Sequence, residues 1–294
     1  MTAVSVYANG NADTTRIKQH LTVLTKTDGY RNADNVMLLN KTADYIYNHF
    51  AQFADTVYYQ EYAVGRETYK NVVCILGADH PKTIVVGAHY DVCGNQQGAD
   101  DNASGVAGLL KLSQLLKEQK LNHRVELVAY TLEEPPYFRT EHMGSYIHAA
   151  SLANSKTEVY GMLSLEMIGY FKDQKHSQSY PIGALALVYG KRGDYITLVN
   201  KVGAGKFAKR FSREFKETKA IKTKKFVGPK ALPGIDFSDH LNYWKFGFSA
   251  LMLTDTAFYR NKNYHQPIDT IETLDIKRMA KVIDGVVGAL TGIK

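Results

Sequence analysis

Apolar residues recur at the spacing of an amphipathic helix in the first part of the chain. Ile17, Leu21 and Leu24 lie three or four positions apart, and the same spacing continues over residues 34–53. Residues at these separations share one face of a helix. The segments 12–24 and 34–53 are therefore predicted to be helices that pack on a core.

Beyond residue 55, short apolar runs alternate with helical patterns. Because alternating strands and helices are typical of α/β proteins, the predicted fold class is α/β, a three-layer α/β/α arrangement with a central mixed, mostly parallel, twisted sheet. The segment 77–82, rich in turn residues, favours an antiparallel hairpin between the second and third strands. A single domain over 1–294 is predicted, with the helices of 1–55 packed on it. Strands are predicted over 56–63, 71–76, 83–90, 124–132, 158–166, 184–189, 219–227 and 248–253, and helices over 103–118, 141–152, 194–211, 238–246 and 275–290.

Composition narrows the class of protein. With 294 residues, 45% of them apolar and 22% charged, the chain is typical of a globular protein with a substantial core. No apolar run approaches the length of a membrane span, and the first 30 residues lack a secretory signal pattern. The two cysteines, Cys74 and Cys93, exclude a disulfide framework and leave one bridge possible.

The net charge of +7 is concentrated in one segment. Residues 191–230 hold 13 Lys or Arg against 3 Asp or Glu, which leaves the rest of the chain at −3. This distribution favours a solvated helix face, and attraction of acidic substrates or of an anionic surface is the alternative. No stacking motif accompanies the basic residues, so nucleic acid is not a predicted partner.

The candidate chemistry begins where the predicted strand 83–90 ends. Its residues are nearly all apolar, as in central strands of α/β sheets, and ligands bind outside the carboxyl ends of such strands. His89 and Asp91 lie there, two positions apart and so on one face of an extended backbone, which suits a metal ligand and a group that orients it. Asp101 follows just before a predicted helix, whose N-terminus favours a carboxylate.

Acidic residues also end two further predicted strands. Glu133 and Glu134 follow one of them, and Glu166 ends the other. Adjacent side chains on a regular strand face opposite ways, so the first two can share a site only where pairing breaks down, as the two prolines after them require. A second histidine, His265, lies in the loop before the last predicted helix.

These carboxylates would repel one another at the edge of a single sheet unless cations neutralised them. Three ligand carboxylates and a hydroxide would balance the charge of two divalent ions, and two imidazoles would complete the ligand set. Imidazole and carboxylate ligands without a thiolate are typical of open, catalytic zinc sites, with manganese or cobalt as alternatives. The predicted cofactor is Zn²⁺, two ions per chain.

Taken together, these motifs resemble those of the di-zinc exopeptidases, a family that includes secreted bacterial leucyl aminopeptidases, glutamate carboxypeptidase II and glutaminyl cyclases. The resemblance runs in order from about residue 83 to residue 290. It implies a zinc-exopeptidase (phosphorylase/hydrolase-like) fold. It rests on H-Y-D at 89–91, G-A-D-D-N-A-S-G at 98–105, E-E at 133–134, M-G-S at 143–145, S-D-H at 238–240 and Y-H-Q-P-I-D-T at 264–270.

The resemblance implies two zinc ions that share one carboxylate. His89 and Glu166 would bind one ion, Glu134 and His265 would bind the other, and Asp101 would bridge them. A cis peptide bond between residues 101 and 102 is also implied.

Two catalytic roles are implied as well. Glu133 would be the general base, which takes a proton from the attacking water and gives it to the leaving amine. Asp91 would orient His89 without itself binding the metal.

The sequence departs from this family in the connection after the glutamate pair, which is longer than usual. Its residues Tyr137, Phe138 and Arg139 are predicted to line the specificity pocket, with Arg139 reading a substrate carboxylate. An exposed loop without substrate contact is the alternative. Glu166 also stands where aspartate is commoner.

The group that stabilises the oxyanion is not identified by the sequence. Zinc itself would contribute, and Tyr259, Tyr243 and His240 are candidates to assist it. Tyr259 is also predicted to bind substrate.

The main hypothesis is a zinc metallo-aminopeptidase that hydrolyses N-terminal residues from peptides. A carboxypeptidase or dipeptidase on the same site is the first alternative, favoured if Arg139 binds a terminal carboxylate. A glutaminyl cyclase is the second, although Tyr264 stands where those enzymes usually carry an indole. A non-catalytic binding module is disfavoured because all ligands are present. The predicted partner is a peptide substrate, the predicted state is a monomer, and the resemblance implies a secreted or periplasmic location.

Overall fold

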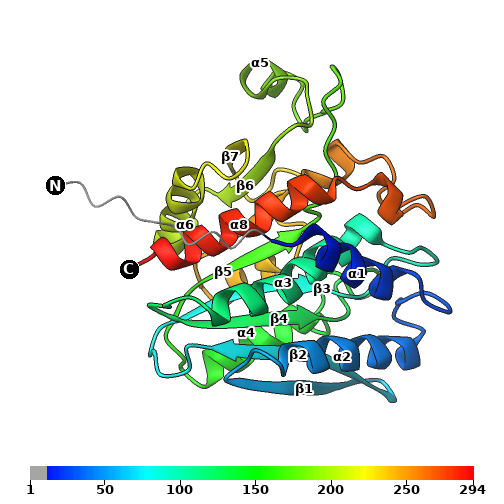
Figure 1. Cartoon of the computed structure of the whole chain (residues 1–294), viewed down its shortest axis with the longest axis vertical. Coiled ribbons are helices and arrows are strands. Elements are labelled where there is room, and N and C mark those ends of the chain that lie inside the picture. Colours follow the sequence, from blue (N-terminus) through cyan, green and yellow to red (C-terminus); the bar gives the residue numbers. More distant parts are fainter. Residues whose placement is uncertain (1–11) are drawn as a thin grey trace.

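The computed structural model describes residues 12–294. They form three layers, with an eight-stranded sheet between two layers of helices (Figure 1). The strands are β1 (Thr56–Val64), β2 (Glu67–Leu76), β3 (Thr83–His89), β4 (Arg124–Tyr130), β5 (Val159–Glu166), β6 (Ile196–Lys201), β7 (Thr223–Gly228) and β8 (Ala250–Thr254). Their order across the sheet is β1-β2-β4-β3-β5-β8-β6-β7.

Four parallel strands, β4, β3, β5 and β8, form the middle of the sheet. On one side β2 and β1 continue it antiparallel, and on the other side β6 pairs antiparallel with β8 and parallel with the edge strand β7. Every residue of β3 is buried, as its continuous apolar run predicts for a central strand. The predicted mixed, mostly parallel sheet is confirmed.

Helices cover both faces of the sheet. The long helices are α1 (Thr14–Thr25), α2 (Val36–Phe50), α3 (Gly105–Lys117), α4 (Gly144–Asn154), α6 (Gly205–Glu217) and α8 (Ile276–Gly292), and shorter ones are α5 (Leu185–Tyr189) and α7 (His240–Lys245). One face carries α1, α2, α3, α6 and α8, and the other carries α4 and α7. Two apolar cores result, one on each side of the sheet.

Aspartates cap the starts of the first and last helices. Asp13 accepts the N–H of Thr15 before α1, and Asp275 accepts the N–H of Arg278 before α8. A carboxylate at this position satisfies backbone donors that the helix itself leaves unpaired. Of the predicted N-terminal region, residues 1–11 lie outside the described part of the chain.

The predicted hairpin between residues 71–76 and 83–90 is wrong. β2 forms its hairpin with β1, through a tight turn at Gly65, and β4 lies between β2 and β3. Turn residues at 77–82 mark a change of direction, but they do not determine which strand becomes the neighbour. β3 pairs in parallel with strands that occur later in the sequence.

Residues 184–189, predicted as a strand, form the short helix α5 instead. None of its five residues is buried, so its apolar run packs neither in the sheet nor in a core. A short apolar run does not by itself distinguish strand from helix. In Figure 1, α5 projects beyond the sheet at the top of the molecule.

The helix predicted over 194–211 is also wrong, because two elements occupy this part of the chain. Residues Ile196–Lys201 form β6, and α6 begins only at Gly205. Gly203 and Gly205 adopt positive φ angles of 76° and 94°, which separate the strand from the helix. Asp194, at the start of the predicted helix, instead pairs with Lys222 at 2.7 Å.

The basic segment covers the outer side of α6. Phe207, Phe211 and Phe215 face the core, while Lys209 and Arg213 are exposed. This arrangement is the solvated helix face that the charge pattern favours. Within residues 12–294 no helix is both long and apolar enough to cross a membrane. Cys74 in β2 and Cys93 after β3 are free thiols.

Candidate metal centre

The predicted ligands meet at the carboxyl edge of the parallel strands. His89 ends β3 and Glu166 ends β5, while Glu134 lies just after β4 and His265 lies in the loop after β8. Asp101 lies in the short π-helical turn Ala99–Ser104 that precedes α3. Parallel strands direct all four connections to one edge, so residues as distant as 89 and 265 come together.

His89, Asp101 and Glu166 form the first group. The Nε2 atom of His89 lies 3.4 Å from Oδ1 of Asp101 and 3.4 Å from Oε2 of Glu166. All three side chains are buried, and their ligand atoms are close enough to hold one ion.

His265, Asp101 and Glu134 form the second group. The Nε2 atom of His265 lies 3.2 Å from Oδ2 of Asp101 and 3.2 Å from Oε2 of Glu134. The two oxygens of Asp101 thus face different histidines, which is the arrangement that a carboxylate bridging two ions requires. The peptide bond between Asp101 and Asn102 is cis, as predicted.

Several buried polar atoms in this cluster lack hydrogen-bond partners among the described residues. They are Nε2 of His89, Nε2 of His265, Oδ2 of Asp101 and Oε1 of Glu134. Buried polar groups are normally paired, and these four belong to side chains that meet at one centre. Imidazole nitrogens and carboxylate oxygens are good ligands for a divalent transition-metal ion, so the residues fit a metal centre.

The charges of the cluster also fit a cation. Burial, followed by repulsion from Asp101, raises the pKa of Glu134 to about 8. Burial alone would lower the pKa of His265, but the adjacent carboxylates of Asp101 and Glu134 raise it to about 10. Burial likewise raises the pKa of Glu133 well above its usual value, with Glu166 and Glu134 adding to the effect against the attraction of His89. Without cations, the cluster retains protons that metal ions would displace.

Asp91 holds the two adjacent glutamates in place. Its Oδ1 accepts the backbone N–H of Glu133 at 3.2 Å and its Oδ2 accepts that of Glu134 at 3.0 Å. The backbone carbonyl of Asp91 lies 3.2 Å from Nδ1 of His89, and its carboxylate lies 3.6 Å from the same atom. Asp91 therefore directs Nε2 of His89 toward the centre.

The break that lets Glu133 and Glu134 share the site occurs earlier than the prolines. β4 ends at Tyr130, and Leu132 adopts a left-handed conformation with φ of 59°. Glu133 then lies with its Oε2 4.0 Å from Nε2 of His89. It is buried, which places its carboxylate inside the ligand cluster.

Asp269 connects the two ligand loops. Its carboxylate accepts the N–H of Asp100 at 3.1 Å and the N–H of Asp101 at 3.0 Å. Because Asp269 follows His265 in the same loop, these bonds fix the bridging aspartate relative to the second histidine. Asp100 is bound in turn by Asn261 through a 2.7 Å hydrogen bond.

Ser238 and Asn102 orient Glu166. The Ser238 hydroxyl donates to Oε2 of Glu166 at 2.8 Å, and the Asn102 amide lies 3.4 Å from the same oxygen. Both residues belong to the motifs at 98–105 and 238–240, but the sequence alone does not indicate this role. Ser164 hydrogen-bonds to Ser238 at 2.6 Å and so supports the same contact.

Sequence reasoning missed Arg31 altogether. Its guanidinium is fully buried and donates to the carbonyl oxygens of Tyr90, Leu24 and Gly98, so it links the first helices to the backbone beside His89. Burial lowers the pKa of Arg31 to about 10, against the attraction of Asp91, Asp269 and Asp101. No motif marks a lone arginine in a loop as a residue of the site.

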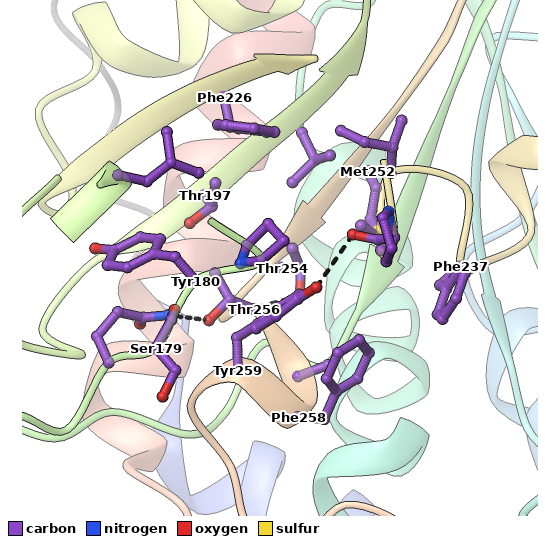
Figure 2. A pocket seen from close by; sticks show the side chains of 18 of the residues that line it. Ser179, Tyr180, Thr197, Phe226, Phe237, Met252, Thr254, Thr256, Phe258 and Tyr259 are labelled. Atoms are coloured by element: carbon purple, nitrogen blue, oxygen red, sulfur yellow. Dashed lines mark hydrogen bonds between the residues drawn. The ribbon is translucent and has the colours of Figure 1, made fainter. Parts of the chain in front are cut away.

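An apolar cavity adjoins the metal centre, and Glu166 contributes to its wall. Figure 2 shows the aromatic side chains of Phe226, Phe237, Phe258 and Tyr259 around it. Tyr259 donates to the carbonyl oxygen of Pro233 at 3.3 Å, which is one of the hydrogen bonds drawn there. Leu185 and Tyr189 of the projecting helix α5 form a further part of the wall.

The three predicted pocket residues after Glu134 are not part of the wall of this cavity. Tyr137 packs near Tyr69, and Phe138 contacts Phe237, which does line the cavity. Arg139 forms a 2.6 Å ion pair with Asp236 and lies over the Phe237 ring. Its charge is therefore paired within the protein.

Two of the candidate oxyanion helpers lie in the core. Tyr243 is fully buried and hydrogen-bonds to His148 and Tyr130, and His240 contacts the carbonyl oxygen of Ile235 at 2.8 Å. Of the three candidates, Tyr259 alone lines the cavity.

The sequence matches the model of peptidase family M28 over residues 71–290. This match covers well over half of the chain, so the chain belongs to peptidase family M28 and is a peptide hydrolase. Members of this family typically depend on metal ions, which agrees with the ligand cluster.

Two curated relatives illustrate the similarity in sequence. YfbL of Escherichia coli, described as an uncharacterized protein, is 41% identical over 292 residues, which cover 97% of this chain and 90% of YfbL. A probable leucine aminopeptidase 1 of Trichophyton verrucosum is 26% identical over 237 residues, covering 75% of this chain and 57% of that protein.

Solved structures share the fold at low sequence identity. The LapA aminopeptidase of Legionella pneumophila matches with a TM-score of 0.73 and 17% identity, covering 95% of this chain and 72% of that chain. A glutaminyl cyclase of Fimbriiglobus ruber matches with a TM-score of 0.72 and 18% identity, covering 96% of both chains. These likenesses confirm the predicted fold class.

Proposed function

We propose that this peptidase is an aminopeptidase that binds two zinc ions and removes N-terminal residues from peptides. The observation that carries the proposal is the position of Asp101, whose two carboxylate oxygens face His89 and His265 separately. A carboxylate that faced a single histidine would fit one ion. A carboxylate whose two oxygens face different histidines fits a pair of ions.

The proposed ligands are His89 and Glu166 for one ion, Glu134 and His265 for the other, and Asp101 for both. When bound, such ions would polarise a peptide carbonyl and lower the pKa of a bound water molecule. Mixed imidazole and carboxylate ligation favours zinc over magnesium or calcium.

Glu133 is the proposed general base. It lies at the centre of the cluster but outside the two ligand groups that share Asp101, so its carboxylate is available to move protons. It removes the proton from the attacking water and delivers it to the leaving amine. Asp91 keeps this carboxylate in place through the backbone of Glu133 and keeps Nε2 of His89 directed inward.

The apolar cavity beside Glu166 is the proposed binding site for an apolar side chain of the substrate. Its aromatic wall would bury such a side chain and exclude water from it. Tyr259 is the residue of this wall that is proposed to contact substrate. Tyr137, Phe138 and Arg139 remain proposed substrate contacts at the outer rim.

An aminopeptidase is favoured over a carboxypeptidase because Arg139 is already paired. Its guanidinium lies 2.6 Å from Asp236, so binding a substrate carboxylate would require this ion pair to break. A free substrate amine, in contrast, would meet the surplus of carboxylates at the centre, among them Glu133.

The proposal is tested by digesting a peptide library with the zinc-loaded chain and with Glu133→Gln, and by measuring both products and bound metal. We expect loss of single residues from free N-termini, no cleavage of N-acetylated peptides, and a fall of at least about a hundredfold in kcat for the variant, because the base contributes about 10²–10⁴-fold. The variant should retain its zinc.

Other outcomes would contradict specific parts of the proposal. Removal of C-terminal residues would show that the protein is a carboxypeptidase and not an aminopeptidase. Formation of pyroglutamate from N-terminal glutamine, with one zinc per chain, would replace it by a glutaminyl cyclase. Undiminished cleavage by Glu133→Gln would refute the role of Glu133.

A further inference from the structure

The helix α5 and the turn before it expose three apolar side chains on a projecting part of the molecule. Leu187 and Val188 are 87% and 77% exposed, and Ile182 is 52% exposed. Ile182 lies at the start of the helix, where its carbonyl oxygen accepts the N–H of Leu185. Figure 1 shows that α5 projects beyond the sheet. Ile182, Leu187 and Val188 form the α5 tip. Single exposed apolar residues are normal, but a cluster of them marks an interaction site.

Basic residues flank the α5 tip in the sequence. Lys175 precedes the tip, Lys191 and Arg192 follow it, and all three are exposed. Residues 174–193 contain no Asp or Glu. The charge beside the tip is therefore positive.

The acidic residues at the two ends of this stretch do not neutralise it, because other cations pair with them. Asp194 pairs with Lys222 at 2.7 Å, and Asp173 pairs with Arg278 at 2.7 Å. A partner that covers the α5 tip should therefore be apolar where it meets the tip and negatively charged around it.

A second copy of the chain and a folded protein partner both fit these features poorly. A symmetric dimer contact places the same patch on both copies, so Lys191 and Arg192 of one copy would approach those of the other. A stable protein interface buries about 800 Å² on each partner, which three aliphatic side chains beside a five-residue helix do not provide. A projecting apolar tip with basic flanks matches the surface of an anionic bilayer, which needs no complementary groove.

We propose that the α5 tip docks on the surface of an anionic phospholipid bilayer. Its apolar side chains enter the boundary between headgroups and acyl chains, and Lys191 and Arg192 contact the lipid phosphates. Attraction to an anionic surface is the alternative that the charge distribution of the sequence leaves open. α5 has five residues and lies in the interface without crossing the bilayer. Because Leu185 and Tyr189 line the apolar cavity, docking holds that cavity next to the lipid surface.

The test is flotation of the full chain with two sets of vesicles, one of phosphatidylcholine and one of equimolar phosphatidylcholine and phosphatidylglycerol. Each Lys or Arg near an anionic surface strengthens binding by about fivefold. We therefore expect binding to the anionic vesicles to be at least about tenfold tighter than to the neutral ones, and to weaken as salt screens the charges. Vesicle binding requires no metal ion and no substrate, so its outcome is independent of the proposed aminopeptidase activity.

A double variant tests the apolar contribution. Leu187→Ala combined with Val188→Ala removes methyl and methylene groups, each of which contributes about fourfold to binding when it is buried. We expect at least about tenfold weaker binding to anionic vesicles. The matched control is Met37→Ala, because Met37 is 69% exposed on α2, which packs on β2 toward the opposite edge of the sheet from β7. The control should bind as the unaltered chain does.

A second double variant tests the charges. Lys191→Gln combined with Arg192→Gln should weaken binding to anionic vesicles by about fivefold for each charge removed. Lys277→Gln combined with Lys281→Gln removes the same charge from exposed positions on α8 and should bind nearly as the unaltered chain does. Circular dichroism checks that all variants are folded.

Three outcomes would overturn the proposal. The first is the absence of binding to anionic vesicles, and the second is an equal loss of binding in the α5 variants and in their controls, which would indicate non-specific attraction of a basic protein. The third is self-association that Leu187→Ala and Val188→Ala abolish, without vesicle binding, which would assign the α5 tip to a second copy of the chain. Equal binding to neutral and anionic vesicles would refute the role of Lys191 and Arg192.

Discussion

Bulky residues with left-handed backbone lie next to the candidate ligands. Leu132 precedes Glu133 with φ of 59°, Met167 follows Glu166 with φ of 54°, and His265 itself has φ of 56°. Such a conformation costs about 1–3 kcal/mol for a residue other than glycine and persists only where its surroundings enforce it. Leu132 and Met167 are fully buried, so the packing of their side chains can supply this enforcement. The ligands are aimed by core packing as well as by hydrogen bonds.

Asp269 provides a test of how hydrogen bonds position the bridging ligand. Replacement by asparagine removes the charge that accepts the N–H groups of Asp100 and Asp101. We expect Asp269→Asn to weaken zinc binding by about 10–100-fold, the usual effect of losing a group that orients a metal ligand. Competition with a chelating dye measures the affinity.

The matched control is Asp284→Asn. That carboxylate also accepts one backbone N–H, from Ala12 at 2.8 Å, but it lies on α8 away from the site. Equal zinc affinities for the two variants would contradict the positioning role of Asp269.

A histidine outside the candidate ligand set should make stability depend on pH. His20 in α1 is buried, with its Nδ1 2.7 Å from the hydroxyl of Tyr45. Burial, assisted by the nearby His49, lowers the pKa of His20 from 6.5 to about 3. As pH falls below 6.5, His20 binds a proton in the unfolded chain but not in the folded chain. The free energy of unfolding therefore decreases, by up to about 1.4 kcal/mol per pH unit.

Urea unfolding between pH 7 and pH 4 measures this effect. We expect the free energy of unfolding of His20→Gln to fall less steeply with decreasing pH than that of the unaltered chain. The difference in slope should correspond to the uptake of about one proton on unfolding. His176→Gln, at an exposed position, serves as the control and should follow the unaltered chain. Parallel curves for all three proteins would show that His20 titrates alike in the folded and unfolded states.

At the scale of elements, β5 and α6 meet where a glycine leaves room for an aromatic ring. A Cβ atom on Gly161 would lie 2.2 Å from ring atoms of Phe207, which is fully buried. We expect Gly161→Ala to destabilise the protein by about 1–3 kcal/mol through overpacking, seen as a lower denaturation midpoint with an unchanged m-value. Gly183→Ala is the control, because a Cβ atom there meets nothing within 4 Å. A Gly161→Ala variant as stable as the control would contradict this account of the contact.

Elements with strong periodicity were predictable from the sequence, and the neighbours of strands were not. The apolar stripe and the cap of α8 follow from local spacing, as does the continuous apolar run of β3. The insertion of β4 between β2 and β3 depends on long-range pairing, which no local pattern encodes. The run 184–189 was misassigned because strand and helix compete for short apolar segments, and its location outside the core decides in favour of helix.

The site was predictable to the extent that its residues form motifs at strand ends. His89, Asp101, Glu134, Glu166 and His265 come from such motifs, and the structure brings them together. Arg31 reaches the same site through a loop whose path depends on the whole fold. A lone arginine carries no signal in the sequence until its contacts are known.

At the scale of the molecule, the candidate ligands link segments that are far apart in the sequence. His89 ends the third strand and His265 follows the last one, and Arg31 adds the N-terminal part of the chain to the same assembly. An unfolded chain contains no preformed site of this kind. Metal binding should therefore contribute directly to the free energy of folding.

Chelation should lower the melting temperature of the chain. A ligand present at about a thousand times its Kd stabilises the folded state by about 4 kcal/mol, which corresponds to a shift of about 6 °C for a chain of this size. Calorimetry with excess zinc and with a chelator measures the shift. An unchanged melting temperature, with metal removal verified by atomic spectroscopy, would show that the metal contributes nothing to folding.

The helix α5 offers a route by which related chains can diverge. Leu185 and Tyr189 shape the proposed substrate cavity, yet no residue of α5 is buried, and Leu187 and Val188 are 87% and 77% exposed. Substitutions here can alter the side chain that the enzyme accepts at little expense in folding free energy. Substrate preference can thus drift over evolutionary time while the sheet and the metal-binding residues remain unchanged.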